Sequence, residues 1–279
     1  MIASQPASTT GPIGLDAGLA PGLIAARADW PASVSAALSS RRAGVSKPPF
    51  DEWNLGDHVG DQPDAVAANR ALLHERLGTR PVFLHQIHGV EVVELNADSH
   101  DGIDADACWT AQPGVACTVM VADCLPLLLS AADGRSVAAV HAGWRGLLGT
   151  GGHGVLEALC ECWPAARSPE QRAGLRVWLG PCIGPTAFEV GTEVMRAYTE
   201  ADPQAARAFV PVAGSDKWLA DLAGLARLRL ARLGISRVAG NDGGPSWCTV
   251  TQRSTFFSHR RDAARLGSTG RMAASIWLR

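Results

Sequence analysis

The sequence of 279 residues lacks the features that mark several large classes of protein. No uninterrupted apolar run reaches the roughly 18 residues that a membrane-spanning helix needs, so no such helix is expected. The N-terminus has no basic segment followed by an apolar stretch, which argues against a secretory signal. The formal charge is only −2, from 25 basic and 27 acidic residues, and neither sign forms a long run. This balance excludes the basic surface of a nucleic-acid-binding protein and a polybasic membrane anchor.

The cysteine spacing and the composition exclude further classes of protein. The seven cysteines show no spacing typical of a disulfide framework, and their number is odd. We therefore expect free thiols in a reducing, cytoplasmic setting. Apolar residues make up 47% of the chain and charged residues 19%, which is enough to bury a sizeable core. The composition excludes a disordered or collagen-like chain and indicates a soluble globular protein.

The domain organisation is predicted to be simple. Residues 1–20 are rich in Ala, Ser, Thr, Pro and Gly and are interpreted as a loose N-terminal tail. From Gly22 onward no linker is long or polar enough to separate two domains, and the chain length allows one large domain. We therefore expect a single catalytic domain over residues 21–279.

Helices and strands are predicted from apolar periodicity and from helix-boundary residues. Pro63 and Gly78 bracket a helix over 64–77, at the start and end positions that these residue types favour. The other predicted helices cover 155–162 and 218–233, and the predicted strands cover 115–121, 136–140, 175–179 and 272–278. Because helices and strands mix without strict alternation, the expected fold is α+β, a single domain with a mixed β-sheet flanked by helices on both sides.

Three short segments place reactive side chains near the ends of predicted strands. They are His85-Gln86-Ile87-His88-Gly89, Ala122-Asp123-Cys124-Leu125-Pro126 and His141-Ala142-Gly143-Trp144-Arg145-Gly146. Cys124 and His141 lie 17 residues apart, enough for two neighbouring strands and the turn between them. A thiolate and imidazoles that converge there suit Zn²⁺, and three protein ligands leave a fourth position open, as in catalytic zinc sites.

Alternatives to this metal site stay open at the level of the residues. A strand cysteine is often only a small core residue, and a histidine is often a hydrogen-bonded group without a metal. His85 and His88 also compete, because positions three apart on a strand face opposite sides and only one is expected to bind. His88 is the better candidate, since Gly89 beside it permits close approach. His85 is then structural or supports a ligand.

Two further segments carry candidate groups. In the turn over 180–185, Cys182 is either a nucleophile or a packed thiol in the wall of a pocket. The arginines at 260, 261 and 271 lie near a glycine-rich site, where guanidinium groups suit an anion such as phosphate, although adjacent arginines are often only solvated. The glycine-rich segment 149–154 opens a predicted helix and offers backbone N–H groups for the same anion.

Taken together, these segments resemble a family whose members are laccase-like polyphenol oxidoreductases and zinc-dependent purine nucleoside phosphorylases. The resemblance runs from about Gly22 to the C-terminus. It includes Asn54-Leu55-Gly56, His58-Val59-Gly60-Asp61, Gln86-Ile87-His88-Gly89, Ala122-Asp123-Cys124-Leu125-Pro126, His141-Ala142-Gly143-Trp144-Arg145-Gly146, Gly180-Pro181-Cys182-Ile183-Gly184 and Phe257-Ser258-His259-Arg260-Arg261-Asp262. It implies zinc ligands at His88, Cys124 and His141. Phe188 is a departure, because a tyrosine is common at that position.

The resemblance also implies a reaction. It is phosphorolysis of adenosine, inosine and S-methyl-5′-thioadenosine by orthophosphate, with adenosine deamination as a further activity. For deamination, Asp123 is the local candidate for moving the proton, unless it only caps backbone N–H groups. Arg145, Arg261 and Asn54 are candidate contacts for phosphate or ribose. Catalytic roles are thus predicted for Asp123, Arg145 and Cys182.

Three other interpretations remain. A multicopper oxidase is disfavoured because the eight histidines form no His-x-His pair, but a single copper ion is compatible with a His₂Cys ligand set. A metal-free cysteine hydrolase would use Cys124 as the nucleophile and His141 as the base. The third is a non-catalytic protein that binds a metal or a partner.

Overall fold

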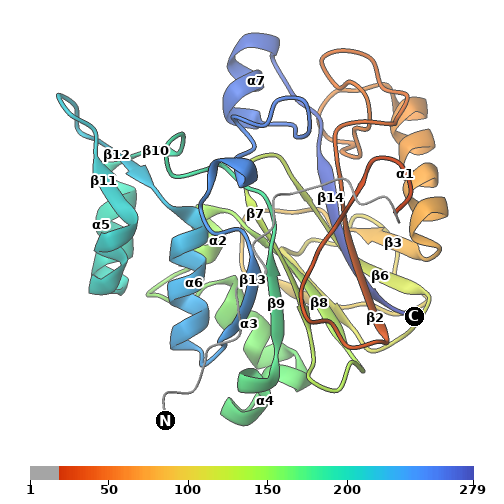
Figure 1. Cartoon of the computed structure of the whole chain (residues 1–279), viewed down its shortest axis with the longest axis horizontal. Coiled ribbons are helices and arrows are strands. Elements are labelled where there is room, and N and C mark those ends of the chain that lie inside the picture. Colours follow the sequence, from red (N-terminus) through yellow and green to blue (C-terminus); the bar gives the residue numbers. More distant parts are fainter. Residues whose placement is uncertain (1–18) are drawn as a thin grey trace, which may run out of the picture.

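Two mixed β-sheets form the centre of the computed structural model, which describes residues 19–279 (Figure 1). The five-stranded sheet has the order β1 (Leu23–Ala25), β2 (Val34–Ser39), β14 (Met272–Leu278), β6 (Val115–Val121) and β3 (Arg80–Phe83). The six-stranded sheet has the order β13 (Arg237–Gly240), β9 (Arg176–Leu179), β7 (Leu125–Ser130), β8 (Val137–Ala142), β5 (Ala107–Thr110) and β4 (Val92–Glu94). Each sheet combines parallel and antiparallel neighbours, such as β3 with β6 and β7 with β8.

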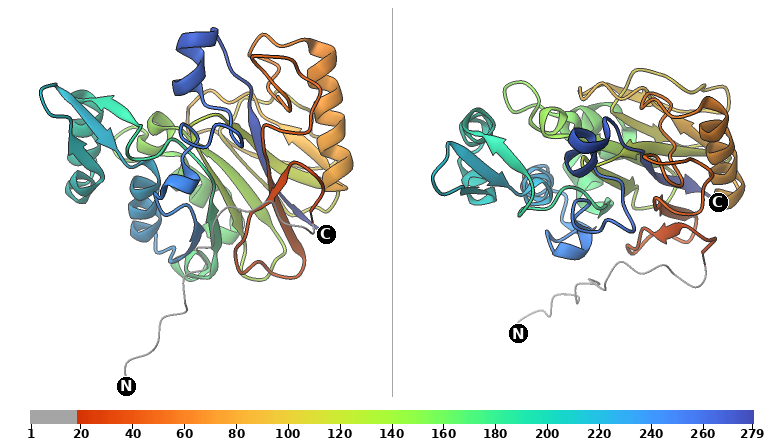
Figure 2. Two further views of the ribbon diagram at one scale, coloured as in Figure 1. Left: turned by 45° about the horizontal axis from the view of Figure 1, so that its top comes forward. Right: turned by 90° about the horizontal axis from the view of Figure 1, so that it is seen from above.

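A small third sheet and the helices surround this centre. The antiparallel strands β10 (Glu189–Gly191), β12 (Lys217–Ala220) and β11 (Phe209–Pro211) extend to one side together with α5 (Thr192–Ala201), as both views in Figure 2 show. The other α-helices are α1 (Pro63–Leu77), α2 (Trp144–Leu148), α3 (Val155–Cys162), α4 (Pro169–Gly174), α6 (Leu222–Arg232) and α7 (His259–Leu266). Short 3₁₀ turns cover Pro164–Ala166, Pro203–Ala208 and Pro245–Trp247.

The alternation of side chains along each strand produces a layered core. Leu128 of β7 packs with Val119 of β6 in an apolar cluster between the two large sheets. Leu127, the neighbour of Leu128, points to the other face and joins a cluster that includes residues of α3 and α6. Met120, next to Val119, instead packs toward Leu73 of α1. The order of layers is therefore α1, the five-stranded sheet, the six-stranded sheet and a second group of helices.

The predicted mixed fold with helices on both sides is confirmed. Helix α3 and strands β6 and β14 have the predicted bounds, and α1 ends at Leu77 with Gly78 in the left-handed conformation (φ 66°). The presence of separate sheets was not predicted. The predicted tail, residues 1–20, lies outside the described residues except for its last two positions. Within residues 19–279, no helix is long and apolar enough to cross a membrane.

The predicted helix over 218–233 is wrong in its first part. Trp218 belongs to β12, where it lies opposite Val190 and Pro211 of the neighbouring strands. Helix α6 begins only at Leu222, because the Asp221 side chain accepts a hydrogen bond from the Gly224 amide (2.8 Å) and caps the helix there. The spacing of three between Leu219 and Leu222 resembles a helical repeat but spans the boundary between a strand and a helix.

Candidate active site

The three predicted metal ligands meet at one edge of the two large sheets. His88 follows β3, Cys124 lies in the short connection from β6 to β7, and His141 lies within β8. Their ligand atoms all lie within 4.8 Å of one another, and Cys124 Sγ is 3.8 Å from His88 Nε2. The rings of His88 and His141 meet edge to face, with centroids 4.8 Å apart. No other group of three such residues was found within residues 19–279.

The local backbone explains how the ligands converge. Strand β6 ends at Val121 in one sheet and β7 begins at Leu125 in the other, so only three residues cross between the sheets. Asp123, in the middle of this crossing, has a φ of 99°, and His88 has a φ of 59°. Positive φ values are uncommon for residues other than glycine and often occur at functional sites. Two sharp bends therefore turn His88 and Cys124 toward His141.

The electrostatics of the cluster favour a charged pair in the absence of metal. Burial opposes ionisation of the Cys124 thiol, but the charge and hydrogen bond of His141, together with His88, lower the thiol pKa to about 6. Burial likewise opposes a charge on His141, but Cys124 and the hydrogen bond to Asp106 raise the pKa of His141 to about 9. Cys124 is thus favoured as the thiolate, which is the form that binds a metal.

A cavity of about 380 Å³ includes the cluster in its lining, and its other lining residues form an apolar set and a basic set by residue type, called here the apolar wall and the basic wall. The apolar wall contains Met120, Val121, Ala122, Trp144, Ile183, Phe188 and Leu222. The basic wall contains His58, His85, His259, Arg260 and Arg271. The three candidate ligands, Asp123 and Gln86 complete the lining, so a bound molecule would face apolar, basic and candidate metal-binding groups together.

Arg271 is a half-buried cation in the lining of the cavity. Burial lowers the pKa of its guanidinium, while the nearby Cys124 and Asp123 act in the opposite direction. Its Nη1 donates hydrogen bonds to the carbonyl oxygens of Thr269 (3.0 Å) and Gly270 (3.3 Å). Within the described part of the chain, the hydrogen bonds of this guanidinium go to carbonyl oxygens and not to a carboxylate. Its charge is therefore available to an anionic ligand.

Comparison with known proteins agrees with this geometry. Residues 35–279 match a family described as multi-copper polyphenol oxidoreductase laccase. The chain belongs to this family. A purine nucleoside phosphorylase of Pseudomonas aeruginosa is 48% identical over 252 residues, covering 90% of this chain and 96% of the relative. Purine nucleoside phosphorylase YfiH of Escherichia coli is 46% identical over 258 residues, with 92% and 98% covered.

Solved structures resemble the whole fold. A Neisseria meningitidis protein, NMB0706, has a TM-score of 0.80 at 43% identity and covers 92% of this chain and 99% of its own. YlmD from Geobacillus stearothermophilus has a TM-score of 0.82 at 28% identity, with 96% and 98% covered. The laccase-like family therefore accounts for almost the entire described chain, including every element that carries a candidate ligand.

Four other candidate residues from the sequence analysis do not line the cavity: Asn54, Arg145, Cys182 and Arg261. Asn54 is fully buried, and its Oδ1 accepts hydrogen bonds from the amides of Gly56 and Arg271. The Arg145 guanidinium stacks on the Trp144 ring at 4.5 Å. The Cys182 thiol is buried, burial raises its pKa, and it accepts a hydrogen bond from Asn241. The roles given to these side chains stay predictions without support from the cavity.

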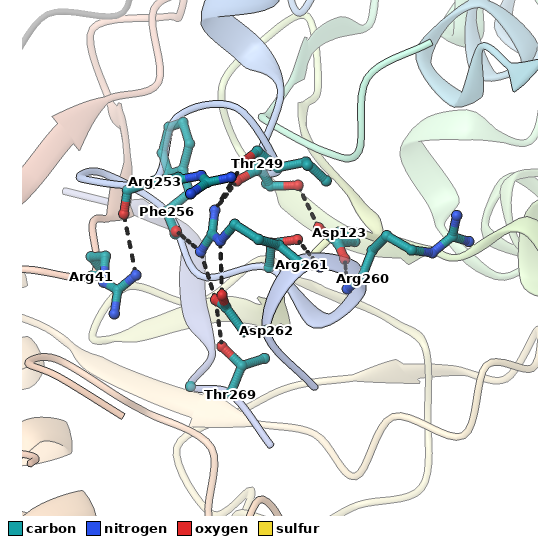
Figure 3. A network of polar contacts seen from close by, with 12 residues as sticks. Arg41, Asp123, Thr249, Arg253, Phe256, Arg260, Arg261, Asp262 and Thr269 are labelled. Carbon is teal, nitrogen blue, oxygen red and sulfur yellow. Dashed lines mark hydrogen bonds and ion pairs between the residues drawn. The ribbon is translucent and has the colours of Figure 1, made fainter. Parts of the chain in front are cut away.

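The fourth of these residues, Arg261, belongs to a buried polar network (Figure 3). Its guanidinium pairs with both oxygens of Asp262 (2.9 and 2.6 Å) and donates to the carbonyls of Thr249 and Phe256 (2.7 and 3.0 Å). Every nitrogen of the guanidinium therefore has a protein partner. In this geometry Arg261 holds the segment before α7 and is not placed to receive phosphate.

Asp123 lines the cavity, but both of its carboxylate oxygens are occupied. Oδ1 accepts a hydrogen bond from the Thr249 hydroxyl, and Oδ2 accepts one from the Arg260 amide (2.6 Å), as Figure 3 shows. The carboxylate thus ties the Cys124 connection to the start of α7. This arrangement agrees with the capping role considered for Asp123, and its role as a proton carrier stays a prediction.

Sequence reasoning assigned no site role to several residues that the structure brings to the site. His58 and His259 were seen only as parts of motifs, whereas Arg271 was named together with Arg260 and Arg261 as a candidate for binding an anion. Asp106, which is buried and contacts His141, was not considered. The one signal for Asp106 is that Asp104-Ala105-Asp106 places two carboxylates directly before a buried strand.

Proposed function

We propose that this protein is a zinc-dependent purine nucleoside phosphorylase that acts on adenosine, inosine and S-methyl-5′-thioadenosine. Orthophosphate would be the second substrate, and the products would be the free base and ribose 1-phosphate or its methylthio analogue. The observation that carries the proposal is the His88, Cys124 and His141 cluster beneath a cavity with one apolar and one basic wall. The names of the curated relatives support it.

The donor set fits zinc. Imidazole nitrogen and thiolate sulfur are common zinc ligands, at bond lengths of about 2.1 and 2.3 Å. Such bonds place tetrahedral ligand atoms about 3.5 Å apart, and the three atoms here lie within 4.8 Å, so small side-chain movements suffice. When bound, zinc supplies a Lewis acid with an open coordination position. The same His₂Cys set also suits copper, so the choice of metal is part of the proposal.

The apolar wall is suited to the nucleoside. Phe188 and Trp144 offer aromatic rings to a purine, and Ile183 and Leu222 exclude water beside them. A purine held there would leave its ribose toward the metal-binding edge. The wall has no hydroxyl at Phe188, so recognition by this residue depends on ring packing alone.

The basic wall is suited to orthophosphate. Phosphorolysis requires phosphate beside C1′ of the ribose while positive charge develops on the sugar. Arg271 supplies a fixed cation, and His58, His85 and His259 supply ring nitrogens around it. Burial and the charge of Arg271 lower the pKa of His58, so the fixed positive charge beside the phosphate is assigned to Arg271 and not to this imidazole. We therefore assign phosphate binding to Arg271 with these histidines.

Adenosine deamination is part of the same proposal and needs a group that carries a proton. Asp123 is the carboxylate in the cavity lining, next to Cys124 in the chain. To act, it would have to release either the Thr249 hydroxyl or the Arg260 amide. We expect deamination to be slower than phosphorolysis for this reason.

The test combines metal analysis with product analysis. Purified full-length protein is expected to contain one zinc per chain and to convert adenosine to adenine and ribose 1-phosphate only when phosphate is present. Cys124→Ala should lose both the metal and turnover. Cys162→Ala is the matched control, because Cys162 is an exposed thiol outside the cavity. Full turnover by Cys124→Ala would refute the mechanism.

One observation favours a second candidate, a metal-free cysteine hydrolase. Asp106, His141 and Cys124 form a chain in which the carboxylate orients the imidazole and the imidazole contacts the thiol. This order of groups is typical of an activated cysteine nucleophile. Stoichiometric metal on Cys124 would exclude it, whereas ester hydrolysis that survives complete chelation and stops on alkylation of Cys124 would favour it.

The laccase-like alternative differs in its metal and its products. A multicopper centre needs several clusters of ligands, and the described residues hold a single one. One copper ion at this cluster would give oxidation of phenols without a need for phosphate. The elemental analysis and the phosphate requirement therefore separate this alternative from the phosphorylase.

A further inference from the structure

Asp106 is a buried carboxylate immediately before β5, and it accepts four hydrogen bonds. Its exposed fraction is 0%. Oδ1 accepts from His141 Nδ1 (2.8 Å) and from the His88 amide (3.0 Å). Oδ2 accepts from the amides of Ile87 (3.2 Å) and Gly89 (2.6 Å). One carboxylate therefore contacts the side chain of one candidate ligand and the backbone around another.

The contact with His141 fixes which nitrogen faces the cluster. The Nδ1 proton is donated to Asp106, so Nε2 is the nitrogen that faces the cluster and that loses its proton when a metal binds. A second backbone contact adds to this, since the His141 amide donates to the Asp106 carbonyl (2.7 Å). The ring of His141 is thus held in one orientation before any metal arrives.

The contacts with the 87–89 loop fix the second ligand. Three successive amides point at the same carboxylate, which holds His88 in the left-handed conformation at φ 59°. That conformation is costly for a residue with a side chain and persists only when its surroundings enforce it. The two oxygens of Asp106 together accept from all four N–H donors.

We propose that Asp106 is a positioning residue that presets both His88 and His141 for a single metal ion. The inference rests on the metal site of the proposed function. It adds that Asp106 raises the metal affinity of this site by orienting two of the three ligands. Histidine ligands commonly donate their second ring nitrogen to a carboxylate, and loss of such a partner weakens metal binding by about 10- to 100-fold. Here the same carboxylate serves two ligands, so the effect is expected at the upper end of that range.

Asparagine tests this role because it keeps the shape and removes two acceptor positions. If its NH₂ group faces His141, the imidazole must accept there and carries its proton on Nε2, which blocks metal binding. If the NH₂ group faces Ile87 and Gly89 instead, the loop that shapes His88 loses two hydrogen bonds. Either orientation disturbs one of the two histidines.

The experiment measures zinc affinity of the full-length apo-protein by competition with a chromophoric chelator. Asp106→Asn is expected to bind zinc 10- to 100-fold more weakly than wild type while its far-UV circular dichroism stays unchanged. Asp104→Asn is the matched control, because Asp104 lies two residues away and pairs with His85 (2.6 Å), which is not a predicted ligand. This control is expected to keep wild-type zinc affinity.

A measurement on the wild type keeps the proposal testable if Asp106→Asn does not fold. In zinc-loaded protein labelled with ¹⁵N-histidine, His141 is expected to show a protonated Nδ1 and a metal-bonded Nε2. Metal on Nδ1 of His141, or wild-type zinc affinity in a folded Asp106→Asn variant, would overturn the role of Asp106 and leave the metal site intact. Failure of the wild type to bind zinc would overturn both.

Discussion

The sequence and the structure assign different roles to Arg261. The sequence suggests a contact with phosphate or ribose, whereas the structure places the guanidinium in a buried polar network. We predict that Arg261→Met destabilises the fold. Its ion pair with Asp262 is largely buried, with side-chain exposures of 9% and 7%. Removing one partner of a buried pair leaves the other charge uncompensated and costs about 3–5 kcal/mol. For a domain of this size, that loss corresponds to a fall of roughly 6–20 °C in Tm.

The assay is thermal and urea unfolding of wild type, Arg261→Met and the double variant Arg261→Met/Asp262→Leu. The double variant should recover at least about 1 kcal/mol relative to Arg261→Met, since it no longer buries a lone carboxylate. Recovery should be incomplete, because the carbonyls of Thr249 and Phe256 still lack their donor. The KM for phosphate of the folded fraction should stay within about twofold of wild type.

The opposite pattern would refute this reasoning. If Arg261 binds phosphate, Arg261→Met would change the free energy of unfolding by less than about 1 kcal/mol and would raise the KM for phosphate at least tenfold. A structural role for Arg261 therefore predicts a large loss of stability with little change in KM. Phosphate binding by Arg261 predicts a large change in KM with little loss of stability.

Further predictions concern the cavity, acid stability, thiol reactivity and the metal. Arg271→Gln should raise the KM for phosphate roughly 10- to 100-fold and leave Tm nearly unchanged. This factor corresponds to the loss of about 1.5–3 kcal/mol, the value of a hydrogen bond to a charged group. An unchanged KM would exclude Arg271 from the phosphate site. Burial opposes ionisation of Asp262, but Arg261 lowers the pKa of this carboxyl below its ordinary value. The ionised Asp262 therefore contributes its full stabilisation above about pH 4, and this stabilisation is lost as the pH falls further. The stability difference between wild type and Asp262→Asn should therefore close below pH 4 in urea titrations. Iodoacetamide at pH 8 should alkylate the exposed Cys162 and spare Cys160, whose pKa burial raises to about 11, as mass spectrometry of peptides will show. Chelation should abolish nucleoside turnover, and zinc should restore it; activity that persists in metal-free protein would contradict the proposal.

Much of the fold could be predicted because local signals coincide with element boundaries. Pro63 and Gly78 mark the ends of α1, and apolar runs between turn residues mark β6 and β14. The division into separate sheets could not be predicted in this way. Whether β6 continues into β7 in the same sheet or crosses to another depends on the backbone of Asp123, and its φ of 99° is not a common choice for aspartate.

The candidate site shows the same contrast between residues that local sequence signals reveal and residues that depend on distant parts of the chain. His88, Cys124 and His141 were found because their residue types are rare and their segments interrupt apolar strands. Asp106 was not, because its role depends on neighbours 17 or more positions away in the chain, such as the Gly89 and His88 amides. Aspartate is a common surface residue, so its type alone carries no signal.

The arrangement of the two sheets also explains why the ligands need such support. His88 and Cys124 follow strands of the five-stranded sheet, whereas His141 lies within the six-stranded sheet. Any sliding of one sheet over the other would separate the ligands, and a zinc ion that binds only the folded protein opposes that motion. At 100 times its Kd, such an ion adds about 2.7 kcal/mol to the free energy of unfolding. Asp106 connects the same two parts without metal, because it lies beside β8 and holds the loop that follows β3. The carboxylate and the proposed ion would therefore act on the same interface, and the contacts of Asp106 would keep the candidate ligands close together while the ion exchanges.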